Sequence, residues 1–314
     1  MSEIPYLSEA DLIALGITTQ DVVESIESAI RGDEAGRVWS APKAVIIPPN
    51  DGRYMMAALA AMDEPSLLAV KTVVLNPENP VRGLPQINGL VTMLDSSSGL
   101  PAAILDGNWI TAVRTAGLSA VAASRLANPD AQSVGFVGCG VQARSHLQSF
   151  ADLFPLKSIK LFGRGQANQD RLTAAAADLG LSVEVSTSGQ DAIEDVDLVV
   201  TSITATGGPE PFLDARGLKS GVFAAVTDLG VPWFRDSFSA LDRVVIDDVE
   251  QEAALPNKLC DPAFISGDLS GLVLGKIDGR MVHDERAAFL FRGHALGDLA
   301  LSVLALQKYR EGYG

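Results

Sequence analysis

Residue types that build disulfide frameworks and metal sites are rare in this chain. Its 314 residues include two cysteines, Cys139 and Cys260, and three histidines. Two cysteines make no disulfide framework, and no cysteine–histidine cluster has the spacing of metal ligands, so we expect no metal site. This cysteine usage fits a reducing, cytoplasmic location.

Basic residues and long apolar runs are also scarce. Lys and Arg number 24 against 39 Asp and Glu, a formal net charge of −15. Because phosphate backbones are bound by clustered Lys and Arg, we expect no nucleic-acid partner. No apolar run approaches the ~20 residues of a membrane span. The first residues, MSEIPYLSEADL, lack the basic and apolar regions of a signal peptide, so we also expect no membrane partner.

The most informative motif follows a short apolar run at 134–137. Gly138-Cys139-Gly140-Val141-Gln142-Ala143 comes next, and then a helical pattern. Strand, G-x-G-x-x-A turn and helix together are typical of a site for a dinucleotide pyrophosphate. Glycines also end strands for conformational reasons alone, but the strand and helix on either side favour a cofactor site. The cofactor-binding residues predicted here are Gly138, Gly140, Val141, Gln142 and Ala143.

After residue 130 the pattern alternates between strands and helices. This alternation predicts an α/β fold with a Rossmann-type, doubly wound parallel sheet. Strands are expected at about 133–137, 158–162, 182–186, 197–201, 221–226 and 243–246, and helices at 141–153, 167–179 and 188–193.

The segments outside 117–293 have a different character. Helices are predicted from Ser8 and over 19–35, a mostly β segment over 42–106, and a helix over 108–126. The final helical pattern, 295–309, is too apolar to lie in solvent, so we expect it to pack on the N-terminal domain. The predicted domains are therefore 1–116 with 294–314, and 117–293.

The end of the second predicted strand bears on cofactor choice. NAD-selective sites usually carry Asp or Glu ~20 residues after the glycines. Here that position holds Gly163, followed by Arg164, whose guanidinium could pair with a 2′-phosphate. Alternatively, Arg164 stacks on the adenine or is solvated. The sequence predicts NAD(P)H and favours NADPH.

Four further segments complete a pattern. Lys71 lies in AVKTVVLNPENPVRGLP, Arg114 in DGNWITAVRTAGLSAVAAS and Asp228 in VFAAVTDLG, and the chain closes with FRGHALGDLALS. Together with the glycine motif, their order and spacing resemble the ornithine cyclodeaminase/μ-crystallin family over nearly the whole chain. The resemblance implies an N-terminal substrate-binding and dimerisation domain, a nicotinamide-binding Rossmann domain and a homodimer. Family members include cyclodeaminases, amino-acid dehydrogenases, imine reductases and a crystallin that binds thyroid hormone.

The resemblance also implies roles for single residues. Lys71 and Arg114 would hold a substrate α-carboxylate, and Asp228 would be the acid/base near the substrate nitrogen. An ammonium in an apolar strand is costly unless it is paired or functional, although Lys71 could also reach solvent at a sheet edge. Arg114 could be an exposed structural residue, and Asp228 could cap a turn. Thr115 and Thr201 are assigned to the cofactor.

Several positions depart from the family pattern. Lys43 stands where members that bind an amino-acid carboxylate generally have Arg, which keeps the charge but loses the bidentate fork. Arg53 lies where cyclodeaminases carry Glu, and Arg292 and His294 replace part of the closing element. These additional cations favour an acidic substrate over a diamino acid, although Arg53 and Arg292 could equally lie on the surface or at an interface, and His294 could simply begin a helix.

The sequence therefore predicts an NAD(P)H-dependent imine reductase, or amino-acid dehydrogenase in reverse, acting on a small 2-imino acid. The additional cations favour a dicarboxylic form of that substrate, as in the conversion of iminosuccinate to aspartate. Two alternatives stay open, an ornithine-type cyclodeaminase that releases ammonia and a non-catalytic, crystallin-like binding protein.

Overall fold

Two sheets organise the chain. The computed structural model describes residues 4–49, 51–204 and 210–313, and it divides into two compact units, residues 1–117 with 294–314 and residues 118–293. The chain is an α/β protein with a mixed sheet in the first unit and a parallel sheet in the second. No helix in these described ranges is long and apolar enough to cross a membrane.

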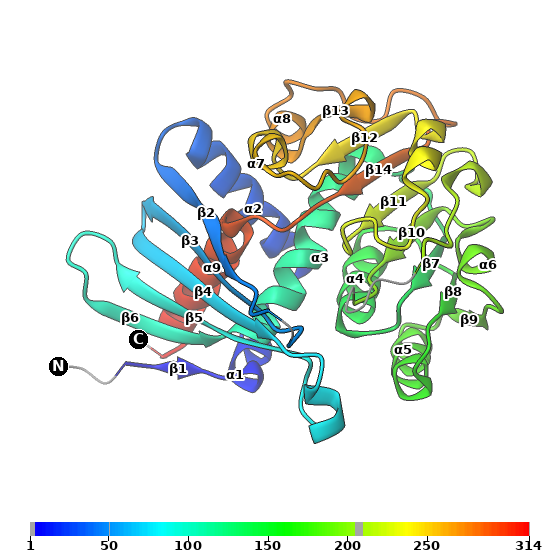
Figure 1. Cartoon of the computed structure of the whole chain (residues 1–314). Coiled ribbons are helices and arrows are strands. Elements are labelled where there is room, and N and C mark those ends of the chain that lie inside the picture. The colour runs from blue at the N-terminus through cyan, green and yellow to red at the C-terminus, as the bar shows by residue number, and fades with distance from the viewer. Residues whose placement is uncertain (1–3, 50, 205–209, 314) are drawn as a thin grey trace. The chain divides into compact units, whose positions relative to one another are not determined.

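The first unit is built on a six-stranded sheet of order β1-β6-β5-β4-β3-β2 (Figure 1). The strand β1 pairs in parallel with β6, and the other neighbours are antiparallel. The strands are β1 (Tyr6–Leu7), β2 (Val38–Ile46), β3 (Tyr54–Asp63), β4 (Ser66–Leu75), β5 (Ile87–Asp95) and β6 (Pro101–Asp106), and a 3-10 helix, η1 (Asn79–Arg82), precedes β5.

Helices cover one face of this sheet. α2 (Thr19–Glu34) packs on α9 (Ala295–Tyr313), and α9 contacts β2, β3 and β4. The predicted packing of the last helix on the N-terminal domain is therefore confirmed. Thr18 and Asp21 form a capping box at the start of α2, as Ser8 and Asp11 do for α1 (Glu9–Ala14). α3 (Gly107–Leu126) starts in the first unit and ends in the second.

The opposite face of the sheet is apolar and open. Strand pairing places Trp39, Leu59, Val74 and Leu90 on one side, each between 40 and 47% exposed. Their neighbours along the strands, such as Ala58 and Val91, are buried toward the helices. The strands thus alternate, but both faces are apolar, which is unusual for a face left to water.

The second unit contains an eight-stranded, fully parallel sheet, as the alternation of strands and helices predicts (Figure 1). Its order is β13-β12-β14-β11-β10-β7-β8-β9. The strands are β7 (Ser133–Val137), β8 (Ser158–Phe162), β9 (Ser182–Val185), β10 (Leu198–Thr201), β11 (Phe223–Val226), β12 (Arg243–Ile246), β13 (Ile265–Asp268) and β14 (Ala287–Leu290). The helices are α4 (Val141–Leu153), α5 (Gln166–Asp178), α6 (Gly189–Ile193), α7 (Val249–Ala254) and α8 (Leu269–Val273), with 3-10 helices η2 (Ala215–Gly217), η3 (Arg235–Ala240) and η4 (Pro262–Phe264).

The sequence pattern does not predict two strands of this sheet. β13 and β14 have four residues each, and β14 is inserted between β12 and β11, where all four of its residues are buried. A run of four apolar residues after a long loop is too short to show a period, so only pairing with neighbours identifies it as a strand.

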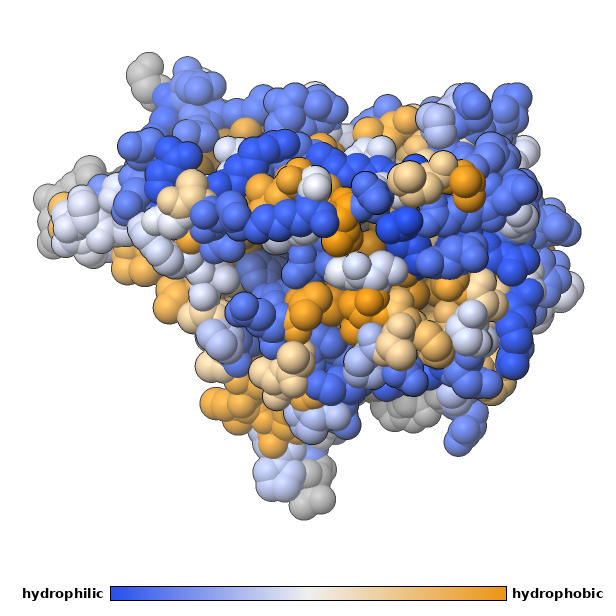
Figure 2. Space-filling view, turned by 90° about the horizontal axis from the view of Figure 1, so that it is seen from above, coloured by the Kyte–Doolittle hydropathy of each residue, from blue (hydrophilic) through white to orange (hydrophobic). Residues whose placement is uncertain are grey.

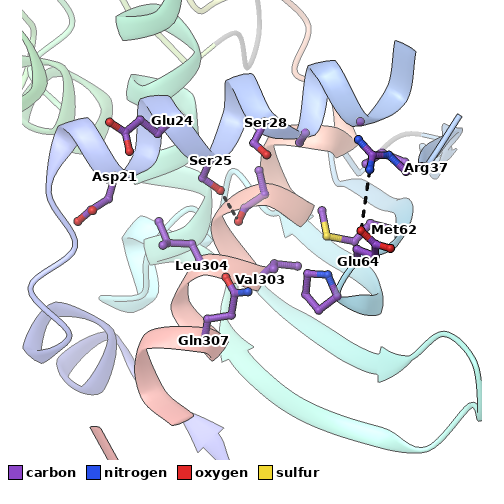
Figure 3. A pocket seen from close by; sticks show the side chains of 15 residues that line it. Asp21, Glu24, Ser25, Ser28, Arg37, Met62, Glu64, Val303, Leu304 and Gln307 are labelled. Atoms are coloured by element: carbon purple, nitrogen blue, oxygen red, sulfur yellow. Dashed lines mark hydrogen bonds and ion pairs between the residues drawn. The ribbon is translucent and has the colours of Figure 1, made fainter. Parts of the chain in front are cut away.

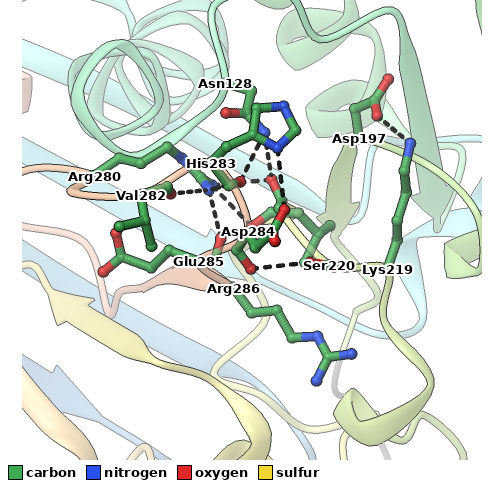
Figure 4. A network of polar contacts seen from close by, with 12 residues as sticks. Asn128, Asp197, Lys219, Ser220, Arg280, Val282, His283, Asp284, Glu285 and Arg286 are labelled. Carbon is green, nitrogen blue, oxygen red and sulfur yellow. Dashed lines mark hydrogen bonds and ion pairs between the residues drawn. The ribbon is translucent and has the colours of Figure 1, made fainter.

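A guanidinium fastens the loop before β14 to the sheet. Arg280 donates from Nη2 to the carbonyl oxygens of Gly221 and Val222 at 3.0 and 3.2 Å, and from Nε to that of Leu126 at 2.8 Å. Figure 4 shows this network, which Asn128 joins through the carbonyl of Gly221. These bonds satisfy carbonyl groups at the end of α3 and at the start of β11 with one side chain.

The molecular surface mixes hydrophilic and hydrophobic residues. On the face drawn in Figure 2, hydrophilic side chains surround several hydrophobic patches. Such scattered apolar groups are ordinary for a folded protein, whereas a continuous patch is not.

Candidate active site

A buried ion cluster forms at the heart of the first unit. Lys71, on β4, is 1% exposed, and its Nζ donates to Asp298 Oδ1 over 2.6 Å. Arg114, on α3, places its Nε 2.9 Å from the same oxygen. Three elements distant in sequence thus contribute one carboxylate and two cations to a single buried point.

Arg114 keeps hydrogen-bonding capacity in this cluster. Its Nε lies close to Asp298 but out of line for a hydrogen bond, and neither Nε nor Nη1 has a hydrogen-bond acceptor among the described residues. A buried guanidinium with unused N–H groups is costly unless an anion completes it. The cluster is therefore suited to a second carboxylate.

The charged groups of the cluster shift one another's pKa values. Burial, and then the charges of Arg114 and Lys43, lower the pKa of Lys71 to about 7 against the opposing effect of Asp298. Burial raises the pKa of Asp298, but Arg114, Lys71 and the hydrogen bond from Lys71 outweigh it and hold that pKa below its usual range. Lys43, half-buried on β2, thus lies near enough to the cluster to act on its charges, and its predicted substrate contact stays a prediction.

The other predicted cations are engaged elsewhere. Arg53 is exposed and pairs with Asp51, two residues before it. Arg292 donates from Nε to the buried Glu252 over 2.6 Å and also bonds the carbonyl of Asn257. His294 accepts a hydrogen bond from the Leu296 amide at 3.2 Å, and its Nε2 lies 3.4 Å from Ser40 Oγ, so it caps the start of α9. A substrate role for these three residues stays a prediction.

The glycine turn lies between β7 and α4, where the order of the strands reverses, as in dinucleotide-binding sheets. Gly138 has φ +96°, and a Cβ there would meet the Ser202 carbonyl at 2.7 Å. A Cβ on Gly140 would meet nothing within 4 Å, so the backbone in front of α4 borders open space. The buried Ala143 packs α4 on the sheet, and Val141 starts the helix. These features fit a pyrophosphate held by the first N–H groups of α4.

Hydrogen bonds of a buried histidine hold the first turn of α4. The Gln142 carbonyl lies 2.8 Å from His146 Nδ1, and Nε2 of that ring lies 2.9 Å from Ser119 Oγ on α3. Burial lowers the pKa of His146 to about 4, so the ring is neutral at pH 7. His146 thus connects α3 to the start of α4, and no pattern in the sequence singles it out.

Asp228 and Thr201 meet at the carboxyl edge of the parallel sheet. Thr201 ends β10, and its Oγ1 donates to Asp228 Oδ1 over 3.0 Å, while the Ile203 amide donates to Oδ2 over 3.1 Å. Trp233 Nε1 lies 3.3 Å from Thr201 Oγ1. Burial raises the pKa of Asp228 to about 6, although these bonds oppose the shift. Thr201 thus orients the Asp228 carboxylate, and its predicted cofactor contact stays a prediction.

Strained backbone follows this carboxylate. Leu229 has φ +60°, an uncommon conformation for a residue with a branched side chain. Gly230 comes next with φ +67°, and its amide bonds the Asp228 carboxylate. The strain thus directs a backbone donor at the acid.

The remaining predicted residues also have definite places. Thr115 is buried on α3 directly after Arg114. Arg164 is exposed after β8, and no acidic residue occurs between Gly163 and Gln169. Asp298, the carboxylate of the ion cluster, lies in the closing segment FRGHALGDLALS and has no predicted role. The signal for it is a single carboxylate in the otherwise uncharged stretch 295–307.

A cavity of about 460 Å³ in the first unit contains none of the predicted site residues. It lies along α2 and α9, where Ser25 donates to the Ala300 carbonyl over 2.9 Å and Arg37 lies 3.9 Å from Glu64 (Figure 3). Small and acidic side chains line it, among them Ser28, Asp21 and Glu24. Lys71, Arg114 and Asp298 are not among its lining residues.

A family model described as the ornithine cyclodeaminase/mu-crystallin family matches residues 7–311. The chain belongs to this family. The membership predicted from Lys71, Arg114, Asp228 and the glycine turn is thereby confirmed, and the chain is an NAD(P)-dependent oxidoreductase of the ornithine cyclodeaminase/mu-crystallin family.

Solved structures share the fold over the whole chain. Δ(1)-pyrroline-2-carboxylate reductase of Thermococcus litoralis, in complex with NADH and L-proline, matches with a TM-score of 0.90 and 24% identity over 98% of each chain. An archaeal alanine dehydrogenase dimer with bound NAD matches with 0.86 and 21% over 99% of this chain and 97% of that chain. The iminosuccinate reductase of Paracoccus denitrificans, in complex with NAD⁺, matches with 0.81 and 20% over 98 and 97%.

Proposed function

We propose that the protein reduces a small 2-imino acid to an amino acid with NAD(P)H, and runs as an amino-acid dehydrogenase in reverse. The buried cluster around Lys71 carries the proposal, because two cations and unused guanidinium N–H groups are arranged around one carboxylate. Reductases and dehydrogenases of imino and amino acids among the fold relatives support this choice.

The proposed carboxylate site is Arg114, assisted by Lys71 and Lys43. Nη1 of Arg114 would donate to the substrate carboxylate, which supplies an acceptor that the described residues do not. Asp298 fixes the Lys71 ammonium and orients the guanidinium before substrate arrives. Such pre-organisation is a large part of the rate gain in two-reactant chemistry.

Asp228 is the proposed acid/base. The bound cofactor would supply the hydride for the imine carbon. The new electron pair on nitrogen then takes the proton from the Asp228 carboxyl group, whose pKa of about 6 leaves part of it protonated near neutrality. Thr201 and the Ile203 amide hold the two carboxyl oxygens in place and stabilise the carboxylate that remains.

A dicarboxylic substrate such as iminosuccinate is the finer form of this proposal. The sequence favours it through Arg53 and Arg292, and a relative with that activity has the same fold. In this chain, however, Arg53 pairs with Asp51 and Arg292 with Glu252. A second substrate carboxylate would have to draw one of these cations from its partner, so the structure gives less support to this form than to a monocarboxylic imino acid.

NADPH is the proposed cofactor. No carboxylate stands at 163–169 to repel a 2′-phosphate, and Arg164 is exposed beside that position. The three similar structures contain NADH, NAD and NAD⁺.

A homodimer is the proposed assembly, formed through the open face of the mixed sheet. Trp39, Leu59, Val74 and Leu90 on this face are uncharged, so two copies of a chain with net charge −15 can meet there without strong repulsion. A hollow of about 690 Å³ over β2 to β5 includes Val74 and Leu90. The archaeal alanine dehydrogenase relative is a dimer. A cytoplasmic location stays a prediction from the sequence.

The decisive assay follows NADPH and NADH oxidation with ammonium and a panel of pyruvate, oxaloacetate and glyoxylate, together with a cyclic imine, pyrroline-2-carboxylate. Turnover of pyruvate or of the cyclic imine supports a monocarboxylic substrate, and turnover confined to oxaloacetate supports the dicarboxylic form. Ammonia release from ornithine without net NAD(P) reduction would favour a cyclodeaminase instead. Cofactor binding with no turnover of any substrate would favour the crystallin-like binding protein.

The role of Asp228 has its own test. Asp228→Asn is expected to lower kcat about 10²-fold or more while leaving the cofactor dissociation constant unchanged, because the variant removes the proton donor alone. In the wild-type protein, kcat/KM for imine reduction should fall as the pH rises above about 6, where the acid loses its proton. Unchanged turnover in Asp228→Asn would contradict the assignment.

A further inference from the structure

The loop after β8 touches the glycine turn through one side chain. A Cβ built on Gly163 would lie 2.8 Å from Cys139 Sγ and 3.4 Å from both Cys139 Cβ and the Cys139 amide nitrogen. Contacts below 3.0 Å are not tolerated without a shift of one partner. Position 163 therefore accepts a side chain only if Cys139 Sγ moves away.

The two loops cannot easily separate to relieve that contact. The Gly138 amide donates to the Phe162 carbonyl over 2.8 Å, which ties the glycine turn to the end of β8. The Gly163 carbonyl in turn accepts a hydrogen bond from Gln169 Nε2 on α5. Cys139 is 4% exposed, so its sulfur has little free space in which to rotate away.

Cations border this loop in a strongly acidic chain. Arg164 follows the glycine directly, and Arg171 lies one turn and a half along α5. Arg144 on α4 is close enough to Arg171 that its pKa is lowered, by burial first and then by that charge. Asp170, the first acidic residue after Gly163, accepts a hydrogen bond from Gln166. The surroundings of position 163 thus suit an anionic group.

We infer that Cys139 is a specificity-determining residue for the cofactor. By filling the space next to position 163, it forces a glycine where NAD-selective sheets carry a ribose-binding carboxylate, and so keeps the site open to the 2′-phosphate of NADPH. This inference rests on the proposed function insofar as it takes the glycine turn as a nicotinamide dinucleotide site. Position 139 and position 163 therefore decide cofactor choice as a pair.

The experiment is a double-mutant cycle read by cofactor binding without any imine. Dissociation constants for NADPH and NADH are measured by fluorescence titration for the wild-type protein, Cys139→Ala, Gly163→Asp and the double variant. We expect Gly163→Asp alone to bind both cofactors poorly, because the turn is displaced. The double variant should bind NADH, with the NADPH-to-NADH preference reversed by about tenfold or more relative to wild type.

A milder cycle reports on the same contact where Gly163→Asp fails to fold. Gly163→Ala is expected to lower Tm by about 5 °C in the Cys139 background and far less in Cys139→Ala. Cys260→Ala, which removes the other buried cysteine, is the matched control. In that background Gly163→Ala should lower Tm as much as it does in the wild-type protein, so that the two effects add.

The inference would be overturned if Gly163→Asp and the double variant had the same ratio of NADPH to NADH dissociation constants. It would also be overturned if the changes in Tm caused by Cys139→Ala and Gly163→Ala simply added. Failure of the wild-type protein to bind either cofactor would overturn the proposed function with it. Normal binding with the predicted cycle but no turnover of any imine would leave the inference intact and refute the proposed reaction alone.

Discussion

Asp298 shows how much depends on a single buried carboxylate. Its exchange for Asn leaves Lys71 and Arg114 facing each other as buried cations. Breaking a buried ion pair from one side costs about 3–5 kcal/mol. We expect Asp298→Asn to lower the free energy of unfolding in urea by that order, and to raise the substrate KM as the carboxylate site loses its shape.

Glu78→Gln is the matched control for that measurement. Glu78 pairs with Arg82 at 2.9 Å, both side chains are exposed, and exposed pairs of this kind contribute about 0.5 kcal/mol. Equal losses in the two variants would show that the Asp298 cluster has no special weight.

Asp228 links the stability of the protein to pH. Its pKa in the folded state, about 6, lies above the ordinary value of 3.8. Between these pH values the folded state binds more protons than the unfolded state, so this contribution is fully present below pH 4 and is lost as the pH rises through 6. The shift corresponds to about 3 kcal/mol.

Urea unfolding at pH 4 and pH 7 measures this contribution. The fall in stability from the lower to the higher pH should be larger for the wild-type protein than for Asp228→Asn, which has no proton to lose. A wild-type difference no larger than that of the variant would refute the burial of a raised-pKa carboxyl group.

Some residues of the site could be predicted from sequence and others could not. The sequence shows that an ammonium at Lys71, in an apolar strand, is costly unless it is paired or functional, and in the structure Lys71 is buried and paired with Asp298. Arg53 pairs with Asp51, two residues before it, and such a local pair can be predicted from the sequence. Glu252 lies forty residues from Arg292, so only the folded chain brings the two together.

At the scale of elements, one glycine in β7 matters for stability, and another in the turn between β7 and α4 matters for cofactor binding. Gly135→Ala places a Cβ 2.0 Å from the Ala192 carbonyl, where α6 crosses β7, whereas a Cβ at Gly140 meets open space. We expect Gly135→Ala to lower Tm strongly, since backbone atoms cannot give way. Gly140→Ala should leave Tm of the cofactor-free protein unchanged and weaken cofactor binding at least tenfold.

Thermal unfolding and fluorescence titration of the two variants provide the check. A stable Gly135→Ala protein would show that α6 does not lie against β7 as described. Unaltered cofactor affinity in Gly140→Ala would mean that the pyrophosphate does not approach this turn.

Elements with a clear period were predictable and the others were not. β7, β8 and α4 have the predicted bounds, because the pattern of apolar residues in each extends over five or more positions. β14 has no such repeat and owes its place to its neighbours β11 and β12.

At the scale of the whole molecule, the open face of the mixed sheet predicts self-association. Leu59→Arg places a charge at the centre of this face and should convert a dimer to a monomer in light-scattering measurements, with cofactor affinity unchanged. Ile13→Arg on α1, an exposed apolar residue away from the sheet, is the control. A Leu59→Arg dimer would show that the copies meet elsewhere.

The first unit is assembled from both ends of the chain. Lys71 finds its carboxylate 227 residues further along, on α9. Two segments far apart in the sequence therefore complete one buried charge pair. Removal of α9 would take away the carboxylate that Lys71 and Arg114 share, and with it the helix that covers β2, β3 and β4. The β segment near the start of the chain thus depends on the closing helix both for charge balance and for burial of its apolar face.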